Sequence, residues 1–216
     1  MDHTKYITQQ INSLRNDIIE VSGLVRNMLT IIDQNLKTHT KIPFNDLLKV
    51  NKRVEKIYFL IKEENLDIIA ELKLADADIR LIIGGTKLIL NYLYISNKLI
   101  SISKNERLDF SNYNIVFIKM IGIIIDMFDK LFIAFTYREI DKCYEVIADD
   151  KNLDDIKNEK YSIIIEEMMK NESLVPIGIE LIELISSMER IGDYLKNISE
   201  NIVYIFTAKN LTFKTS

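Results

Sequence analysis

The chain has 216 residues, of which 48% are hydrophobic and 28% are charged, with six glycines, two prolines and no tryptophan. This composition is typical of a soluble helical protein, and the length allows one large domain or two small ones. The formal net charge of −4 disfavours broad nucleic-acid binding, because neutralising phosphates requires a basic face and the sequence shows none.

Membrane insertion and secretion are also disfavoured. The longest apolar stretches are interrupted by Lys87, Lys119 and Asp126 before they reach the roughly 20 apolar residues that span a bilayer. The N-terminal segment lacks the basic and apolar regions of a secretory signal. The single cysteine, Cys143, fits a reducing compartment and a packing role. We therefore expect a cytoplasmic protein.

The first half of the chain predicts three helices. Apolar residues recur three or four positions apart and predict a long amphipathic helix at about residues 4–36. Pro43 cannot occupy a helix interior and Asn45 can cap a helix, so a second helix is expected to begin there and to extend to about residue 71. The third helix is expected at about residues 76–103.

A polar segment at residues 103–112 is the expected midpoint, and three further helices follow it. They are expected at about residues 112–135, 139–170 and 174–207. Ser173 is the expected N-cap of the last helix, with Pro176 tolerated in its first turn.

The order of one long helix and two further helices occurs twice, which indicates an internal repeat. A shift of 99 residues places Gly23 on Gly122, and a shift of 95 aligns the third helix with the sixth. Three-helix units with short loops pack as antiparallel bundles. The predicted fold is therefore all-α, with two tandem antiparallel three-helix bundles at residues 1–103 and 104–216.

An acidic stripe follows the last predicted helix. Glu189, Asp193, Asn197 and Glu200 are spaced by four, four and three residues, so they share one side of that helix. Like charges four residues apart repel by a few tenths of a kcal/mol, and the helix-weakening Gly192 stands between the first two. A solvated acidic face is one interpretation of this stripe.

A metal site is the other interpretation. The fifth predicted helix carries a second pair of the same spacing, Asp150 and Asp154. In an antiparallel hairpin the middles of the two helices face each other, which would bring four carboxylates together. Their mutual repulsion, about 1 kcal/mol per close pair, would be relieved by a hard cation that prefers oxygen ligands. The missing side chain at Gly192 would allow close approach.

The segment MERIGDYLKNISENIVYIF resembles the C-terminal motif of the PhoU family, the accessory proteins of bacterial high-affinity phosphate transport. DADIRLIIGGTKLI and VIADDKNLDDI resemble two further motifs of this family, and the resemblance extends over the whole chain. It implies two three-helix bundles whose paired acidic motifs bind metal ions. The implied ligands here are Asp150, Asp154, Glu189 and Asp193, together with the neighbouring motif positions Asn197 and Glu200. The ion would be divalent or trivalent, such as Mg, Mn, Fe or Zn.

The first half has lost most of the corresponding acids. Tyr94 and Lys98 stand where the ERIGD motif has its two acids, and Asn51 and Glu55 stand where the fifth helix has its pair. Lys98 could pair with Glu55 and place an internal cation where the family binds a metal. We therefore predict metal binding in the second bundle only. The formal charge is +2 for residues 1–103 and −6 for residues 104–216, in agreement with this prediction.

No catalytic arrangement is visible in the sequence. His3 and His39 are poorly placed for catalysis, and GGTK at residues 84–87 lacks the spacing of a phosphate-binding loop. Gly84 and Gly85 are instead expected to allow close packing. A carboxylate-bridged di-iron oxidase would need Glu-x-x-His pairs, which are missing.

By resemblance, the protein is expected to be a regulatory adaptor and not an enzyme. It would contact the ATP-binding subunit of a phosphate ABC transporter and a sensor histidine kinase. It would repress phosphate uptake and phosphate-starvation genes when phosphate is plentiful. The alternative is a metal-free helical protein-interaction module with a solvated acidic stripe. The sequence leaves open the identity and number of the metal ions and the oligomeric state, with a homodimer among the alternatives.

Overall fold

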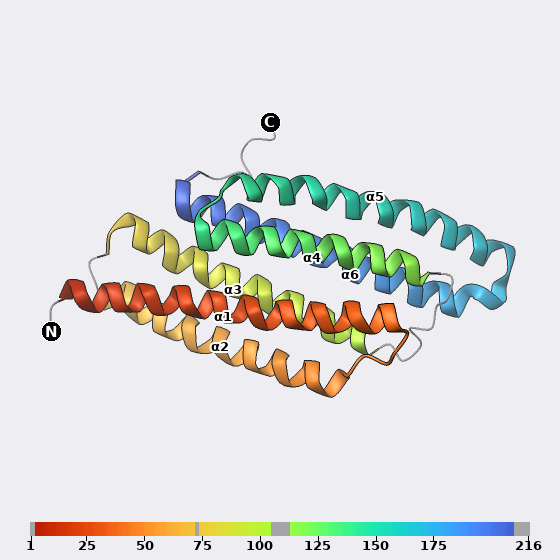
Figure 1. The fold of residues 1–216 in the computed structure, drawn as a ribbon, viewed down its shortest axis with the longest axis horizontal. Helices are drawn as coiled ribbons and strands as arrows, with labels where there is room; N and C mark the ends of the chain where they lie inside the picture. Colours follow the sequence, from red (N-terminus) through yellow and green to blue (C-terminus); the bar gives the residue numbers. More distant parts are fainter. Residues whose placement is uncertain (1–2, 72–73, 105–112, 210–216) are drawn as a thin grey trace.

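The computed structural model describes residues 3–71, 74–104 and 113–209. Its regular structure in these ranges is helical: α1 (His3–Thr38), α2 (Phe44–Glu71), α3 (Asp76–Ser103), α4 (Asn114–Tyr137), α5 (Asp141–Lys170), the 3-10 turn η1 (Glu172–Leu174) and α6 (Val175–Thr207). Helices α1, α2 and α3 form one three-helix bundle, and α4, α5 and α6 form the second (Figure 1). The predicted all-α fold with two tandem bundles is confirmed. Within the described ranges, no helix is long and apolar enough to cross a membrane.

The two bundles pack side by side through α3 against α6 and through α1 against α4. At the first contact, a Cβ added to Gly84 of α3 would collide with the side chain of Ile205 of α6. A Cβ at Gly85 would lie 2.9 Å from Cδ1 of Ile18 in α1. Both glycines therefore let helices approach closely, as predicted. The buried apolar side chains of all six helices form one continuous core, and Cys143 is buried within it.

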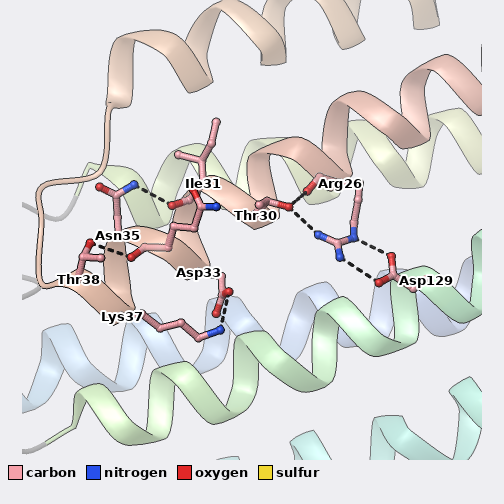
Figure 2. Close-up of polar contacts among 9 residues, drawn as sticks. Arg26, Thr30, Ile31, Asp33, Asn35, Lys37, Thr38 and Asp129 are labelled. Carbon is pink, nitrogen blue, oxygen red and sulfur yellow. Dashed lines mark hydrogen bonds and ion pairs between the residues drawn. The ribbon is translucent and has the colours of Figure 1, made fainter.

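An ion pair joins the bundles at the contact of α1 with α4. Figure 2 shows Arg26 of α1 reaching Asp129 of α4: Nε donates to Oδ1 at 2.6 Å and Nη2 donates to Oδ2 at 2.9 Å. The remaining Nη1 donates to Thr30 Oγ1 at 2.6 Å. This two-bond geometry sets the orientation of the partners. Because the two side chains are 32% and 50% exposed, the pair contributes at most about 1 kcal/mol to stability.

The predicted helix ends are mostly within two residues of the observed ones. The prediction of Ser173 as the N-cap of the last helix is wrong, because the side-chain Oδ1 of Asn171 accepts from the Ser173 backbone N–H at 3.1 Å and caps η1 instead. Pro176 does lie in the first turn of α6. Most of the predicted connector, residues 105–112, lies outside the described residues, so the domain boundary after residue 103 stays a prediction.

Candidate metal centre

The two predicted acidic pairs lie on facing helices of the second bundle. Asp150 and Asp154 belong to α5, and Glu189 and Asp193 belong to α6, which packs antiparallel against α5. Asp150 is 3% exposed and Glu189 is 7% exposed. Asp154 is half-buried, and Asp193 is exposed. Each pair therefore has one buried acid and one acid closer to solvent.

The four carboxylates interact electrostatically. The pKa of Asp193 is raised above its usual value, first because the carboxyl loses hydration and then because the negative charges of Glu189, Asp150 and Asp154 repel its own. Only the charge of Lys196 acts in the opposite direction. The hairpin thus brings both acidic pairs into mutual range, at a cost to the ionised form of Asp193.

Two lysines contact the buried acids. Lys157 Nζ of α5 donates to Glu189 Oε1 at 2.7 Å, and Lys196 Nζ of α6 donates to Asp150 Oδ2 at 2.9 Å. These hydrogen bonds raise the pKa of both lysines. The sequence reasoning missed both residues. The available signal was their position, three residues after Asp154 and three after Asp193, although the partner that each lysine contacts lies on the other helix.

Gly192 creates the close approach of α5 and α6. A Cβ at this position would lie 2.5 Å from Leu153 Cδ1 and 3.2 Å from Asp150 Oδ1, so a side chain there would press on buried atoms of α5. Asp150 Oδ1 is itself buried without a hydrogen-bond partner. One carboxylate oxygen of the cluster therefore lacks compensation, which is costly in a buried position.

The donor atoms of this cluster fit a hard cation, since all are carboxylate oxygens and Asp150 Oδ1 lacks a partner. The spacing of these oxygens in the structure, however, does not form a metal site. Among the described residues, no three His, Cys, Asp or Glu side chains are grouped closely enough to hold a metal ion. A metal held by Asp150, Asp154, Glu189 and Asp193 would need these side chains to draw together. It would also meet the two lysine ammonium groups.

The other two candidate ligands lie further along α6. Asn197 and Glu200 line a groove of about 480 Å³ between α3 and α6, together with Lys87 and Asn91 of α3 and other residues. Asn197 is exposed. The structure therefore brings the ERIGD acids together with α5 and directs Asn197 and Glu200 toward the first bundle.

The corresponding place in the first bundle is filled by neutral groups. The buried side chain of Asn51 in α2 donates from Nδ2 to Ser96 Oγ at 2.9 Å and to Asn97 Oδ1 at 2.8 Å, both in α3. With the shift of 95 residues, Asn97 occupies the position of Gly192. The suggested pair of Lys98 with Glu55 is wrong, because these two residues form no ion pair in the structure. An amide network replaces the charges instead.

Comparison with known proteins agrees with the fold and the motifs. Residues 117–202 match the family model of the PhoU domain. The chain is 22% identical to a phosphate-specific transport system accessory protein PhoU homolog of Thermotoga maritima, over 98% of this chain and 93% of that protein. It is 24% identical to the accessory protein PhoU of Escherichia coli, over 93% of this chain and 86% of that protein.

Solved structures show the same fold. The crystal structure of PhoU from Pseudomonas aeruginosa superimposes with a TM-score of 0.84 at 20% identity, covering 94% of this chain and 99% of that one. PhoU from Streptococcus pneumoniae gives a TM-score of 0.76 at 17% identity, with coverages of 95% and 99%. The domain match, the whole-length relatives and the shared fold together support the resemblance of this chain to the PhoU family.

Proposed function

We propose that this protein is a regulatory adaptor of phosphate homeostasis that works by contact with other proteins and not by catalysis. The observation that carries the proposal is the match over nearly the whole chain to proteins named as accessory to phosphate-specific transport. The partners that fit this role are the ATP-binding subunit of a phosphate ABC transporter and a sensor histidine kinase, both reached from the cytoplasm. The regulation is negative: phosphate uptake and starvation genes are repressed when phosphate is abundant.

A complementation experiment tests this role. The chain is expressed in a bacterium that lacks its own PhoU and carries a reporter of phosphate-starvation genes. Restored repression at high phosphate, with release at low phosphate, is the expected result. Reporter activity that stays high at both phosphate concentrations, despite normal levels of folded protein, would exclude the proposed role in that host.

We further propose that the carboxylates of the second bundle bind a cation. Asp150, Asp154, Glu189 and Asp193 supply the oxygens, and bound metal would relieve the repulsion that raises the pKa of Asp193. Such an ion would strengthen the contact of α5 with α6 and would turn over no substrate. Asn197 and Glu200 lie apart from this cluster along α6, so we expect their replacement by Ala to leave metal content unchanged.

A metal-free bundle is the second candidate, favoured by the ion pairs of Lys157 with Glu189 and of Lys196 with Asp150. Metal analysis of protein purified without chelator separates the two. A bound Mg, Mn, Fe or Zn ion that disappears in the double variant Glu189→Gln, Asp193→Asn supports the metal site. Equal, near-zero metal content in both proteins supports the metal-free module.

A further inference from the structure

The two helices of the cluster carry the same eight-residue pattern. In α5, Asp150 and Asp154 are followed three residues later by Lys157; in α6, Glu189 and Asp193 are followed three residues later by Lys196. Both segments therefore read acid-x-x-x-acid-x-x-Lys. The proposed metal motifs include only the acids of this pattern.

Antiparallel packing turns this repeated pattern into a reciprocal one. The lysine of each helix crosses to the first acid of the other: Lys157 to Glu189 at 2.7 Å and Lys196 to Asp150 at 2.9 Å. The two acids that receive these contacts are the buried ones. The ammonium groups therefore compensate the two carboxylates for which an unpaired charge would be most costly.

The first bundle offers an internal comparison. With the shifts that align the repeat, Lys157 corresponds to Tyr58 and Lys196 corresponds to Ser101. The buried acid Asp150 corresponds to Asn51, whose amide forms neutral hydrogen bonds. Where the buried acids are absent, both lysines are absent too. This paired loss indicates that the lysines belong with the acids and are not general surface charges.

We infer that Lys157 and Lys196 are built-in counter-ions of the carboxylate cluster, so that the second bundle folds without metal and a cation binds only in competition with the two ammonium groups. The second part of this inference, the competition between a cation and the two lysines, rests on the proposed metal site. The counter-ion role depends only on the observed contacts. Four acids face two lysines, and Asp150 Oδ1 remains without a partner, so the compensation is incomplete and leaves the cluster attractive to a cation.

Removing either ammonium group should therefore strengthen metal binding and weaken the metal-free protein. The variants are Lys157→Met and Lys196→Met, which keep most of the length of the side chain. Lys151→Met is the matched control, because Lys151 is an exposed residue of α5 between the two acids and forms no ion pair in the structure. Mn²⁺ is the probe, and its affinity for the full chain is measured by titration calorimetry after dialysis against EDTA.

We expect Mn²⁺ affinity to rise at least about tenfold in each of the two variants and to change less than about threefold in the control, since only the former lose a cation in direct contact with a ligand. In EDTA, Lys157→Met should unfold at lower denaturant concentration than the wild type. Addition of Glu189→Gln, which removes the unpaired charge, should restore much of the loss.

The outcomes separate the inference from the metal site on which it partly rests. Mn²⁺ binding of equal strength in the wild type and the lysine variants would overturn the competition, although the metal site would stand. No Mn²⁺ binding by any of the proteins would overturn the competition together with the metal site. Unchanged stability of Lys157→Met in EDTA, or no rescue by Glu189→Gln, would overturn the counter-ion role.

Discussion

Replacement of Gly192 by Ala tests whether α5 and α6 are in contact at the cluster. The added Cβ would lie 2.5 Å from Leu153 Cδ1 and 3.2 Å from Asp150 Oδ1, and Leu153 is fully buried. Forcing an extra methyl group into such a site costs about 1–3 kcal/mol. Ala also favours a helix interior over Gly by about 1 kcal/mol. The net effect of Gly192→Ala is therefore expected to range from neutral to a loss of about 2 kcal/mol.

Gly122→Ala is the matched control, since Gly122 lies in the middle of α4 and an added Cβ meets no atom within 4 Å. This substitution should show only the greater preference of Ala over Gly for a helix interior, and it should stabilise the protein by about 0.5–1 kcal/mol. The difference between the two variants then isolates the packing cost, about 1–3 kcal/mol. Each kcal/mol corresponds to about 2–4 °C in melting temperature for a chain of this length.

Equilibrium unfolding in urea, followed by circular dichroism at about 222 nm, measures both free energies, provided that the denaturant slopes agree. Equal stabilisation by the two substitutions would refute the reasoning, because it would mean that the space beside Gly192 accepts a methyl group. The close approach of the two helices at the carboxylate cluster would then lose its main support.

Three further outcomes are expected. Asn51→Asp should lower stability by about 1–3 kcal/mol in urea unfolding, because a carboxylate cannot donate to Asn97 Oδ1 and loses the bonds that Asn51 makes; an unchanged midpoint would contradict this. Arg26→Lys should cost less than about 1 kcal/mol, and a cost that persists in about 1 M NaCl would argue against an exposed ion pair with Asp129. Asp193→Asn should stabilise the EDTA-treated protein at pH 7. The raised pKa of Asp193 means that folding opposes its ionisation, so the gain should shrink as the pH falls toward about 4; a gain independent of pH would contradict this.

The sequence allowed the fold to be predicted because helical periodicity and chain breaks are local signals. Pro43 and the polar connector divide the apolar pattern without reference to distant residues. The wrong prediction of Ser173 as the N-cap of α6 arose where the apolar pattern carries no signal. Ser173 and Asn171 are both residues that cap helices, and the choice between them depends on the short 3-10 turn, which the apolar pattern does not reveal.

The meeting of the two acidic pairs was predictable from the sequence in part, because spacing within a helix is also a local signal. Four-residue spacing placed each acidic pair on one side of its helix, and the hairpin brought the two pairs into electrostatic range. The register of α5 against α6 decides which side chains meet, and it is set by packing at positions such as Gly192 and Leu153. The contacts of Lys157 and Lys196 depend on this register, so spacing within a single helix did not reveal them.

The two bundles stabilise equivalent positions in different ways, and the difference bears on where regulation can act. In the first bundle, Asn51 is held by neutral hydrogen bonds, which attract no ion. In the second, two lysines compensate the buried acids, while Asp150 Oδ1 lacks a partner and Asp193 is repelled by three neighbouring carboxylates with only Lys196 acting in the opposite direction. Partly compensated charge can respond to a cation, whereas a satisfied amide network gives a cation little to bind. If the proposed cation binds, the change that it causes is expected to begin in α5 and α6. Helix α6 also packs against α3 of the first bundle, where the side chain of Ile205 meets Gly84.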